Sequence, residues 1–405
     1  MDTIFDEYKK LCNEFDQFDN NTIPLCAAEN YISNFVKKPL ISSFEGRYSC
    51  VNSDGTNSFL EGEYIERLKE LLQKQCKKMF NSDYTNADTL TGINCFTVCA
   101  MSLLKSGDHV LLTTPEQGGH PSIPFILDSL QVKYTPIPYD YNNYQIDYVR
   151  FNNLCKNRKY SFAIFCQSDL INTPDLNQIN LEKIGIIYDA TQTLGLMSCN
   201  VIENPLKYNN VILIGGSHKT LPGPSCGLIM TNNKQYQLKL SHCISPIFLR
   251  NVQPNHIAGM LLALIEQEQF GIQYQNKIVY VANLLAEQLE EHNFKVAHCE
   301  KDKYTNTHQI FILMSEKEAN LFYQQSKKYN ISLNLKHKKL FNNYGIRIGT
   351  QHIARYNWDK SELAQLAKLL KLIKDNSSTQ EINEIRLSLI RKKIPQFTYD
   401  NILIE

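Results

Sequence analysis

A lysine follows a short apolar run near the middle of the chain. Residues 210–216 read NVILIGG and predict a buried strand, and Lys219 stands three positions later, in the stretch SHKTLPG. A lysine at a strand end, between small residues and a Gly/Pro turn, can be partly desolvated and can reach a carbonyl carbon, as an amine that forms a Schiff base must. Taken alone, Lys219 could equally be an exposed loop lysine.

An aspartate closes another apolar run, 30 residues earlier. Residues 184–189 read IGIIYD and predict a second buried strand that ends at Asp189. A carboxylate at that place is costly unless it meets a cation, and the protonated ring nitrogen of pyridoxal phosphate is such a cation. The Asp/Lys pair therefore favours a pyridoxal-phosphate enzyme. For Asp189 alone, the alternative is a helix N-cap.

Three further motifs fit the same cofactor. The stretch Thr91-Gly92-Ile93 precedes a helical pattern, so backbone amides and the threonine hydroxyl can bind a phosphate at the positive end of a helix. His120 follows two glycines that would let an imidazole approach the pyridine face. Arg347 lies in an apolar run and would bind the carboxylate of an amino-acid substrate in bidentate geometry. The alternatives are an ordinary N-cap, a surface turn histidine and a salt-bridged arginine.

Short apolar runs predict the scaffold that carries these residues. They read as buried parallel strands bounded by turns, with helical patterns between some of them, at 109–114, 160–166, 184–189, 210–216 and 226–231. The segment from Gly92 to Lys105 predicts a helix that is closed by a Gly turn. This order of elements is typical of an α/β fold.

The pattern changes after about residue 256. A long helical stretch to Glu291 precedes strand-like and helical segments in alternation, which predict a smaller α+β domain. We divide the chain into an N-terminal arm and helix (1–40), a large cofactor-binding domain (41–265) and a small C-terminal domain (266–405).

Composition excludes several other classes of protein. The chain has 42 basic and 41 acidic side chains, and its net charge of +1 does not indicate a basic surface that would bind nucleic acid. The short basic runs at 336–339 and 391–393 are expected to be solvated. We expect no membrane span and a cytoplasmic location. Twelve cysteines are scattered without a CxxC pair, and Cys95 and Cys99 lack further ligands nearby, so no metal site is expected.

In this order, the motifs resemble those of serine hydroxymethyltransferase and its relatives in the fold-type I pyridoxal-phosphate superfamily. The resemblance runs from about Pro24 to Trp358. It implies a large domain with a mostly parallel seven-stranded sheet and a smaller C-terminal domain. It also implies a homodimer in which loops of the partner, including Tyr48 and the segment 250–254, complete each active site.

The resemblance also assigns roles to individual residues. Lys219 corresponds to the lysine of the "HKT" motif, Asp189 to the pyridinium aspartate, His120 to the ring-stacking histidine and Ser168 to a serine near the phenolic oxygen. The residues given to the cofactor are Thr91, Gly92, Ile93, His120, Ser168, Asp189, Gln192, His218 and Lys219. Those given to the substrate are Glu29, Tyr48 and Arg347.

Several positions depart from the family pattern. Cys50 stands where the family has its folate-facing glutamate, and the loop that follows is rewritten as VNSDGTNSFL. The phosphate-binding "GGQGG" loop is replaced by RNVQP, in which Arg250 or Gln253 would have to donate instead. Gln192 stands where the family has histidine and looks more like a cysteine desulfurase. The sequence thus matches the cofactor-binding motifs of the family and departs from its folate-binding motif.

Two kinds of reaction follow from this resemblance. One is aldol, retro-aldol or transaldolase chemistry, similar to hydroxymethyl transfer but without tetrahydrofolate, at the Cα–Cβ bond of a small amino acid. The alternative breaks another bond with the same cofactor, as an aminotransferase, racemase, decarboxylase or β-lyase does.

Overall fold

A seven-stranded sheet forms the centre of the computed structural model, which describes residues 3–52 and 54–402. In spatial order its strands are β2 (Tyr84–Asn86), β10 (Gly227–Thr231), β9 (Val211–Gly216), β8 (Gly185–Asp189), β7 (Phe162–Phe165), β3 (His109–Leu112) and β4 (Lys133–Pro136). Neighbours from β9 to β4 are parallel, whereas β10 runs antiparallel to both β9 and β2. The predicted mostly parallel sheet is therefore confirmed.

The direction of β10 corrects one prediction. Residues 226–231 were expected to form a parallel strand, but this strand follows β9 directly and returns beside it. Every residue of β10 is buried, as is every residue of β9. A strand covered on both faces has the same apolar sequence in either direction, so composition could not distinguish the two.

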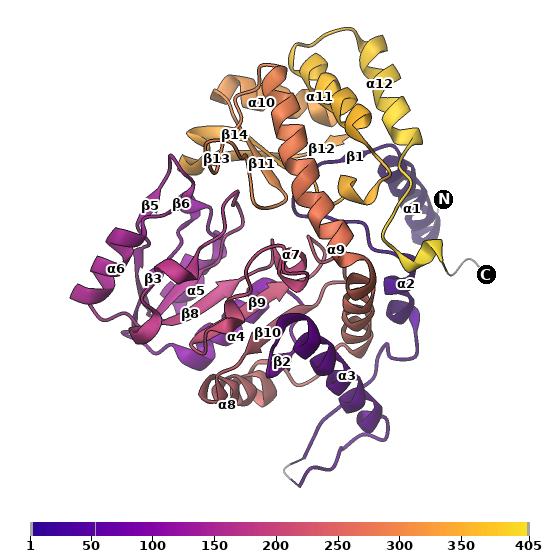
Figure 1. Ribbon diagram of the computed structural model, residues 1–405. Helices are drawn as coiled ribbons and strands as arrows, with labels where there is room; N and C mark the ends of the chain where they lie inside the picture. Colours follow the sequence, from indigo (N-terminus) through magenta and orange to yellow (C-terminus); the bar gives the residue numbers. More distant parts are fainter. Residues whose placement is uncertain (1–2, 53, 403–405) are drawn as a thin grey trace.

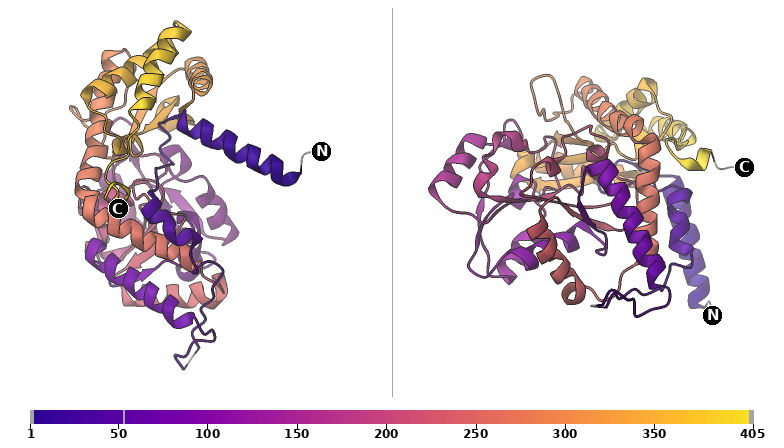
Figure 2. Two further views of the ribbon diagram at one scale, coloured as in Figure 1. Left: turned by 90° about the vertical axis from the view of Figure 1, so that its right-hand side faces the viewer. Right: turned by 60° about the horizontal axis from the view of Figure 1, so that its bottom comes forward.

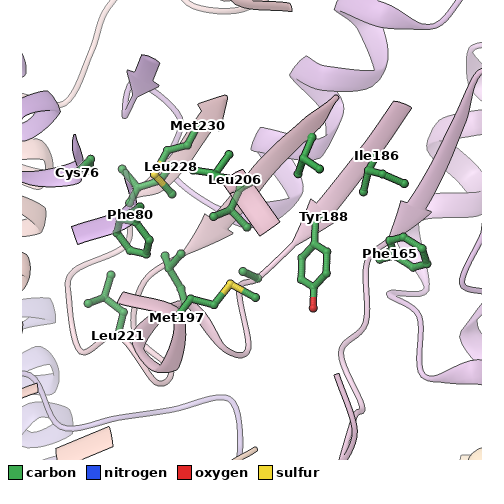
Figure 3. Packing of buried hydrophobic residues seen from close by; sticks show 14 of the residues in the cluster. Cys76, Phe80, Phe165, Ile186, Tyr188, Met197, Leu206, Leu221, Leu228 and Met230 are labelled. Atoms are coloured by element: carbon green, nitrogen blue, oxygen red, sulfur yellow. The ribbon is translucent and has the colours of Figure 1, made fainter. Parts of the chain in front are cut away.

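Helices cover both faces of the central sheet. One face packs against α3 (Gly62–Phe80), α6 (Tyr148–Asn157), α7 (Leu194–Ser198) and the start of α9 (Pro254–Glu291). Figure 3 shows this packing, with Phe80 of α3 and Met197 of α7 beside sheet residues such as Tyr188. The other face packs against α4 (Gly92–Leu103), α5 (Ser122–Ser129) and α8 (Lys234–His242). The apolar runs of the sequence are explained by this double cover.

A second lobe is built on a three-stranded antiparallel sheet in the order β11 (Gln309–Leu313), β14 (Asn343–Gly349) and β13 (Asn334–Lys338). Alternate residues such as Ile312 and Ile346 face a core formed with the later part of α9, α10 (Glu316–Lys328), α11 (Lys360–Lys374) and α12 (Thr379–Arg391). The opposite face of β14 and β13 turns toward the central sheet and carries Arg347.

The N-terminal segment joins the second lobe. Strand β1 (Ile23–Pro24) pairs in parallel with β12 (Ile331–Ser332), and Ile23 is part of the same core. Helix α1 (Ile4–Asn20) has no buried residue and projects away from the other elements (Figure 2, left). Short elements follow at α2 (Asn34–Lys37) and at the hairpin β5 (Tyr139–Asp140) and β6 (Gln145–Ile146).

Helix α9 runs along both lobes (Figure 1). It is continuous across residue 265, so the division of the chain placed there falls inside one helix. Within the described ranges, no helix is long and apolar enough to cross a membrane. The same residues contain no group of three or more His, Cys, Asp or Glu side chains that could hold a metal.

Candidate active site

The ends of β8 and β9 lie side by side at one edge of the central sheet. Asp189 is the last residue of β8 and pairs with Ile214 of β9, whose own last residue is Gly216. Lys219 follows three positions after that end. His218 adopts a φ of +75°, a conformation that is strained for a residue with a Cβ and that is common at functional sites. The backbone thus turns sharply where it presents Lys219.

Hydrogen bonds fix the lysine loop against its neighbours. The Thr220 hydroxyl donates to the carbonyl of Gln192 over 2.9 Å and accepts from the backbone N–H of Gly195 over 3.1 Å. The Thr220 carbonyl accepts from the Gln275 amide over 2.8 Å. The Asn30 amide donates to the carbonyl of Lys219. The loops after β8 and β9 are therefore held as one unit, which sets the position of Lys219 relative to Asp189.

The two charged groups are both perturbed by burial. Burial lowers the pKa of Lys219 to about 8, although the nearby Asp189 carboxylate opposes this shift. Burial raises the pKa of Asp189, against a 2.8 Å hydrogen bond from the backbone N–H of Thr191. Among the described residues, Asp189 forms no ion pair. A cation beside Asp189 and a carbonyl beside Lys219 would satisfy both groups.

The N-terminus of α4 lies close to the same edge. Thr91 is its N-cap, and its hydroxyl accepts from the backbone N–H of Asn94 over 3.3 Å. A Cβ at Gly92 would lie 2.3 Å from the Thr191 hydroxyl oxygen, so only glycine permits this approach. The Thr191 hydroxyl in turn accepts from the N–H of Gly216 over 3.0 Å. The first-turn amides of a twelve-residue helix, including that of the half-buried Ile93, are thus placed beside the ends of β8 and β9.

Two glycines hold the segment that carries His120. Gly118 has a φ of +89°, and a Cβ there would lie 2.1 Å from the carbonyl oxygen of Asp169. A Cβ at Gly119 would lie 2.0 Å from the carbonyl oxygen of Thr113. Burial lowers the pKa of His120, with Asp189 opposing and Lys219 adding to the shift. The shift favours the neutral imidazole, which suits packing on an aromatic ring.

Arg347 reaches the site from β14 and is buried. Its Nη1 donates to Asp169 Oδ1 over 2.7 Å and to the carbonyl of Ser168 over 2.8 Å. Its Nε and Nη2 donate to Asn334 Oδ1 over 3.2 and 2.8 Å. The guanidinium is close enough to Lys219 to lower the pKa of that lysine. Arg347 is thus an ion-pair member, the alternative that its sequence left open, and four of its five N–H groups are engaged within the protein.

These groups fit pyridoxal phosphate by their chemistry. Asp189 offers a carboxylate without an ion partner among the described residues, Lys219 a nucleophilic amine, and the start of α4 a set of amides and a hydroxyl. A sequence model of the family described as serine hydroxymethyltransferase matches residues 4–370. The chain belongs to this family. It is therefore a pyridoxal-phosphate-dependent transferase, and membership supports chemistry at the Cα–Cβ bond of an amino acid.

Curated relatives agree over nearly the whole length. The serine hydroxymethyltransferase of Pyrobaculum aerophilum is 28% identical over 391 residues, which cover 92% of this chain and 90% of the relative. That of Methanothermobacter thermautotrophicus is 27% identical over 386 residues, covering 91% and 89%. A crystal structure of L-threonine transaldolase from Pseudomonas fluorescens superposes with a TM-score of 0.91 at 21% identity, covering 99% of this chain and 95% of that one. That likeness establishes the shared fold-type I architecture.

Other residues that the family resemblance assigned form no hydrogen bond or ion pair with Asp189 or Lys219 among the described residues. Tyr48 is 47% exposed, in the loop before α3, and its ring packs near Phe59 with centroids 5.2 Å apart. The Glu29 side chain is exposed, and its carbonyl accepts from the Gln351 amide over 2.6 Å. Arg250 is exposed and lines a cavity of about 170 Å³ together with Cys50. Gln253 is the N-cap of α9. Their roles in binding remain predictions.

Sequence reasoning missed several residues of the site. Asp169 is fully buried and binds Arg347, Lys336 and Lys338. The basic run 336–339 was expected to be solvated, which is wrong for Lys336 and Lys338, whose side chains are only 17% exposed. Polar residues at alternate positions of β13 could have indicated this, because alternate side chains of a strand share one face.

The depressed pKa of Lys219 predicts how the apoprotein takes up its cofactor. Only the neutral amine attacks the aldehyde, so the attachment rate should rise about tenfold per pH unit below a pKa of about 8 and level off above it. Stopped-flow absorbance of apoprotein mixed with pyridoxal phosphate measures this rate. A rate that keeps rising toward the ordinary lysine pKa of about 10.4 would contradict the lowered value.

Proposed function

We propose that the protein catalyses aldol, retro-aldol or transaldolase chemistry on a small β-hydroxy-α-amino acid without tetrahydrofolate. Membership in the serine hydroxymethyltransferase family supports the cofactor and the type of bond. One observation carries the finer proposal. Asp189 and Lys219 are both present at the ends of neighbouring strands, whereas Cys50 replaces the glutamate at the folate-facing position. The cofactor chemistry is retained where the folate chemistry is not.

Each residue at the edge has a part in the proposed reaction. Pyridoxal phosphate, when bound, withdraws electrons from Cα and so weakens a bond aligned perpendicular to its ring. Asp189 would keep the ring nitrogen protonated, and His120 would hold the ring by packing against it. Arg347 binds the substrate carboxylate and thereby sets which Cα bond is aligned. Lys219 would hold the cofactor and, as a free amine with its pKa lowered to about 8, would exchange a proton with the substrate near neutral pH.

The loop at the folate position supports independence from folate. Cys50 has a thiol in place of a carboxylate, and its backbone N–H donates to the Asn57 side chain over 3.2 Å. Of the nearby glutamates, Glu66 accepts from the Ser49 hydroxyl and Glu61 pairs with Arg47 at 3.6 Å. A general acid or base for hydroxymethyl transfer to folate is therefore not supplied at position 50.

Folate dependence is the direct test of this proposal. Adding tetrahydrofolate should leave the rate of glycine formation from serine unchanged, because the acid/base carboxylate is replaced by Cys50. Chromatographic assay of glycine, with and without tetrahydrofolate, measures the rate. The variant Cys50→Glu is the matched comparison. Saturable folate-dependent formation of glycine by the unmodified protein would show that the folate reaction survives.

A second candidate function keeps the cofactor and changes the bond. Gln192 is buried, and its side-chain oxygen accepts from the Gln309 amide over 3.0 Å, which leaves its own N–H groups to donate toward the cofactor. This arrangement favours a β-lyase, aminotransferase, racemase or decarboxylase. Products formed from a panel of amino acids, identified by mass spectrometry, distinguish these reactions from Cα–Cβ cleavage.

We also propose that the protein is a homodimer located in the cytoplasm. Helix α1 exposes apolar side chains along its length, among them Phe5, Leu11 and Phe15, which a second copy would cover. The exposed Tyr48 and the segment 250–254 fit completion of a partner's site. The cysteines of the chain are all free thiols, as is usual in a reducing compartment.

A further inference from the structure

Three cationic side chains converge on one buried carboxylate beside the site. Asp169 has no exposed side-chain surface, and its Oδ1 binds Arg347 Nη1 at 2.7 Å and Lys336 Nζ at 2.8 Å. Its Oδ2 binds Lys338 Nζ at 2.6 Å. We call these four residues the Asp169 cluster.

The geometry of β13 explains how two lysines reach one carboxylate. Residues 334, 336 and 338 alternate along the strand and share the face that turns toward the central sheet, whereas His337 and Lys339 are exposed. Asn334 pairs in register with Arg347 of β14, which brings the guanidinium onto the same face. The cluster is therefore formed by regular strand geometry.

The Asp169 cluster has more positive than negative charges. Three cations and one carboxylate leave two positive charges, and in the described residues Lys336 and Lys338 form no ion pair except with Asp169. Burial lowers the pKa of Lys336 to about 8, and Arg347 and Lys338 push it in the same direction. The nearby Glu116 is exposed and binds the backbone N–H of Lys339. Uncompensated charge in a partly buried place is costly unless an anion binds there.

The cluster borders the substrate side of the active site. The backbone N–H groups of Ser168 and Asp169 both donate to the carbonyl of Gly118, at 2.7 and 3.0 Å, two residues before His120. Lys338 is close enough to His120, and Arg347 to Lys219, to lower the pKa of each. An amino acid whose carboxylate reaches Arg347 therefore has the two lysines nearby.

We propose that the substrate carries a second anionic group, a carboxylate or a phosphate on its side chain, and that Lys336 and Lys338 bind it. One excess charge of the cluster matches the α-carboxylate that every amino acid has, and the other is available for the second anion. In the synthetic direction the same group belongs to the aldehyde that becomes the side chain. The inference rests on the proposed function and narrows its substrate class.

Calorimetric titration of the holoenzyme tests this preference. The neutral ligand is L-threonine, and the anionic ligands are 3-hydroxyaspartate, 3-hydroxyglutamate and O-phosphoserine, which separate carboxylate from phosphate and short from long side chains. At least one anionic ligand should bind at least about tenfold more tightly than threonine, because charge pairs in partly desolvated sites have large coupling energies.

Variants of the two lysines test whether the Asp169 cluster causes the tighter binding of anionic ligands. Lys336→Met and Lys338→Met should each lose most of the difference in affinity between the anionic ligand and threonine, whereas Lys338→Arg should retain this difference. Lys339→Met is the matched control, because Lys339 is exposed one position further along and should leave the preference unchanged. Thermal melting of each variant checks folding, and only variants that melt near the unmodified protein are compared.

The outcomes separate this inference from the proposed function. If no amino acid binds the holoenzyme, the proposed function fails and the inference with it. If threonine binds and no anionic ligand is preferred, or the preference survives both methionine variants, only the inference is overturned. Lys336 and Lys338 would then serve to hold Asp169 between the lobes.

Discussion

Replacing Lys219 with alanine is expected to abolish covalent attachment of pyridoxal phosphate and to lower turnover by several orders of magnitude. The reason is that Lys219 is the amine at the shared edge of β8 and β9, with a pKa lowered to about 8. Borohydride reduction followed by peptide mass spectrometry measures attachment, which should map to the peptide that contains residue 219.

The control for this variant is Lys234→Ala, which removes an exposed lysine at the start of α8. It should retain both the added mass and the visible absorption of the bound cofactor. If Lys219→Ala still gave a protein with the cofactor covalently attached, another lysine would hold it and the site would lie elsewhere.

Replacing Arg347 with lysine should weaken amino-acid binding by about 2 to 5 kcal/mol while cofactor absorbance is retained. The planar guanidinium donates to Asp169, Ser168 and Asn334 and still has one Nη2 N–H group for a substrate carboxylate, and lysine keeps the charge without that fixed geometry. Asp169 stays paired with Lys336 and Lys338 in the variant, so the carboxylate is not left without a cation. Calorimetric titration and thermal melting measure the two effects separately.

A second buried arginine provides the matched control. Arg355 is 1% exposed, pairs with Glu266 at 3.3 Å and donates to the carbonyl of Phe397 over 2.8 Å. Arg355→Lys should lower the melting temperature and leave amino-acid binding unchanged. If Arg347→Lys behaved in the same way, Arg347 would be a structural ion-pair member only.

Much of the central sheet could be predicted because its strands are covered on both faces. The runs that end at Asp189 and Gly216 are almost wholly apolar, and this composition marks a buried strand without reference to its partners. Strands β1 and β12 have two residues each and depend on pairing with each other, so no local pattern indicated them. Helix α9 was predicted in extent, whereas its continuity across both lobes depends on tertiary packing.

The cofactor-binding residues could be predicted where the chemistry of the side chain itself indicates its role. Lys219 and Asp189 could be found because an amine and a carboxylate at adjacent strand ends suit a single cofactor. Asp169 could not, because an isolated aspartate in a polar loop is ordinary until the fold brings three cations to it. That Arg347 already forms an ion pair could not be predicted either, because its partner Asp169 lies 178 residues away in the sequence.

The continuity of α9 ties the unfolding of the two lobes together. Its 38 residues span about 57 Å at the usual rise per residue. Ile257 and Leu264 near its start belong to the core under the central sheet, whereas Ile278 and Leu285 belong to the core of the second lobe. Loss of either core would leave half of this helix without tertiary packing, and a helix of that length is marginal by itself in water. We therefore expect the two lobes to unfold together, so that a substitution that weakens one core also lowers the stability of the other.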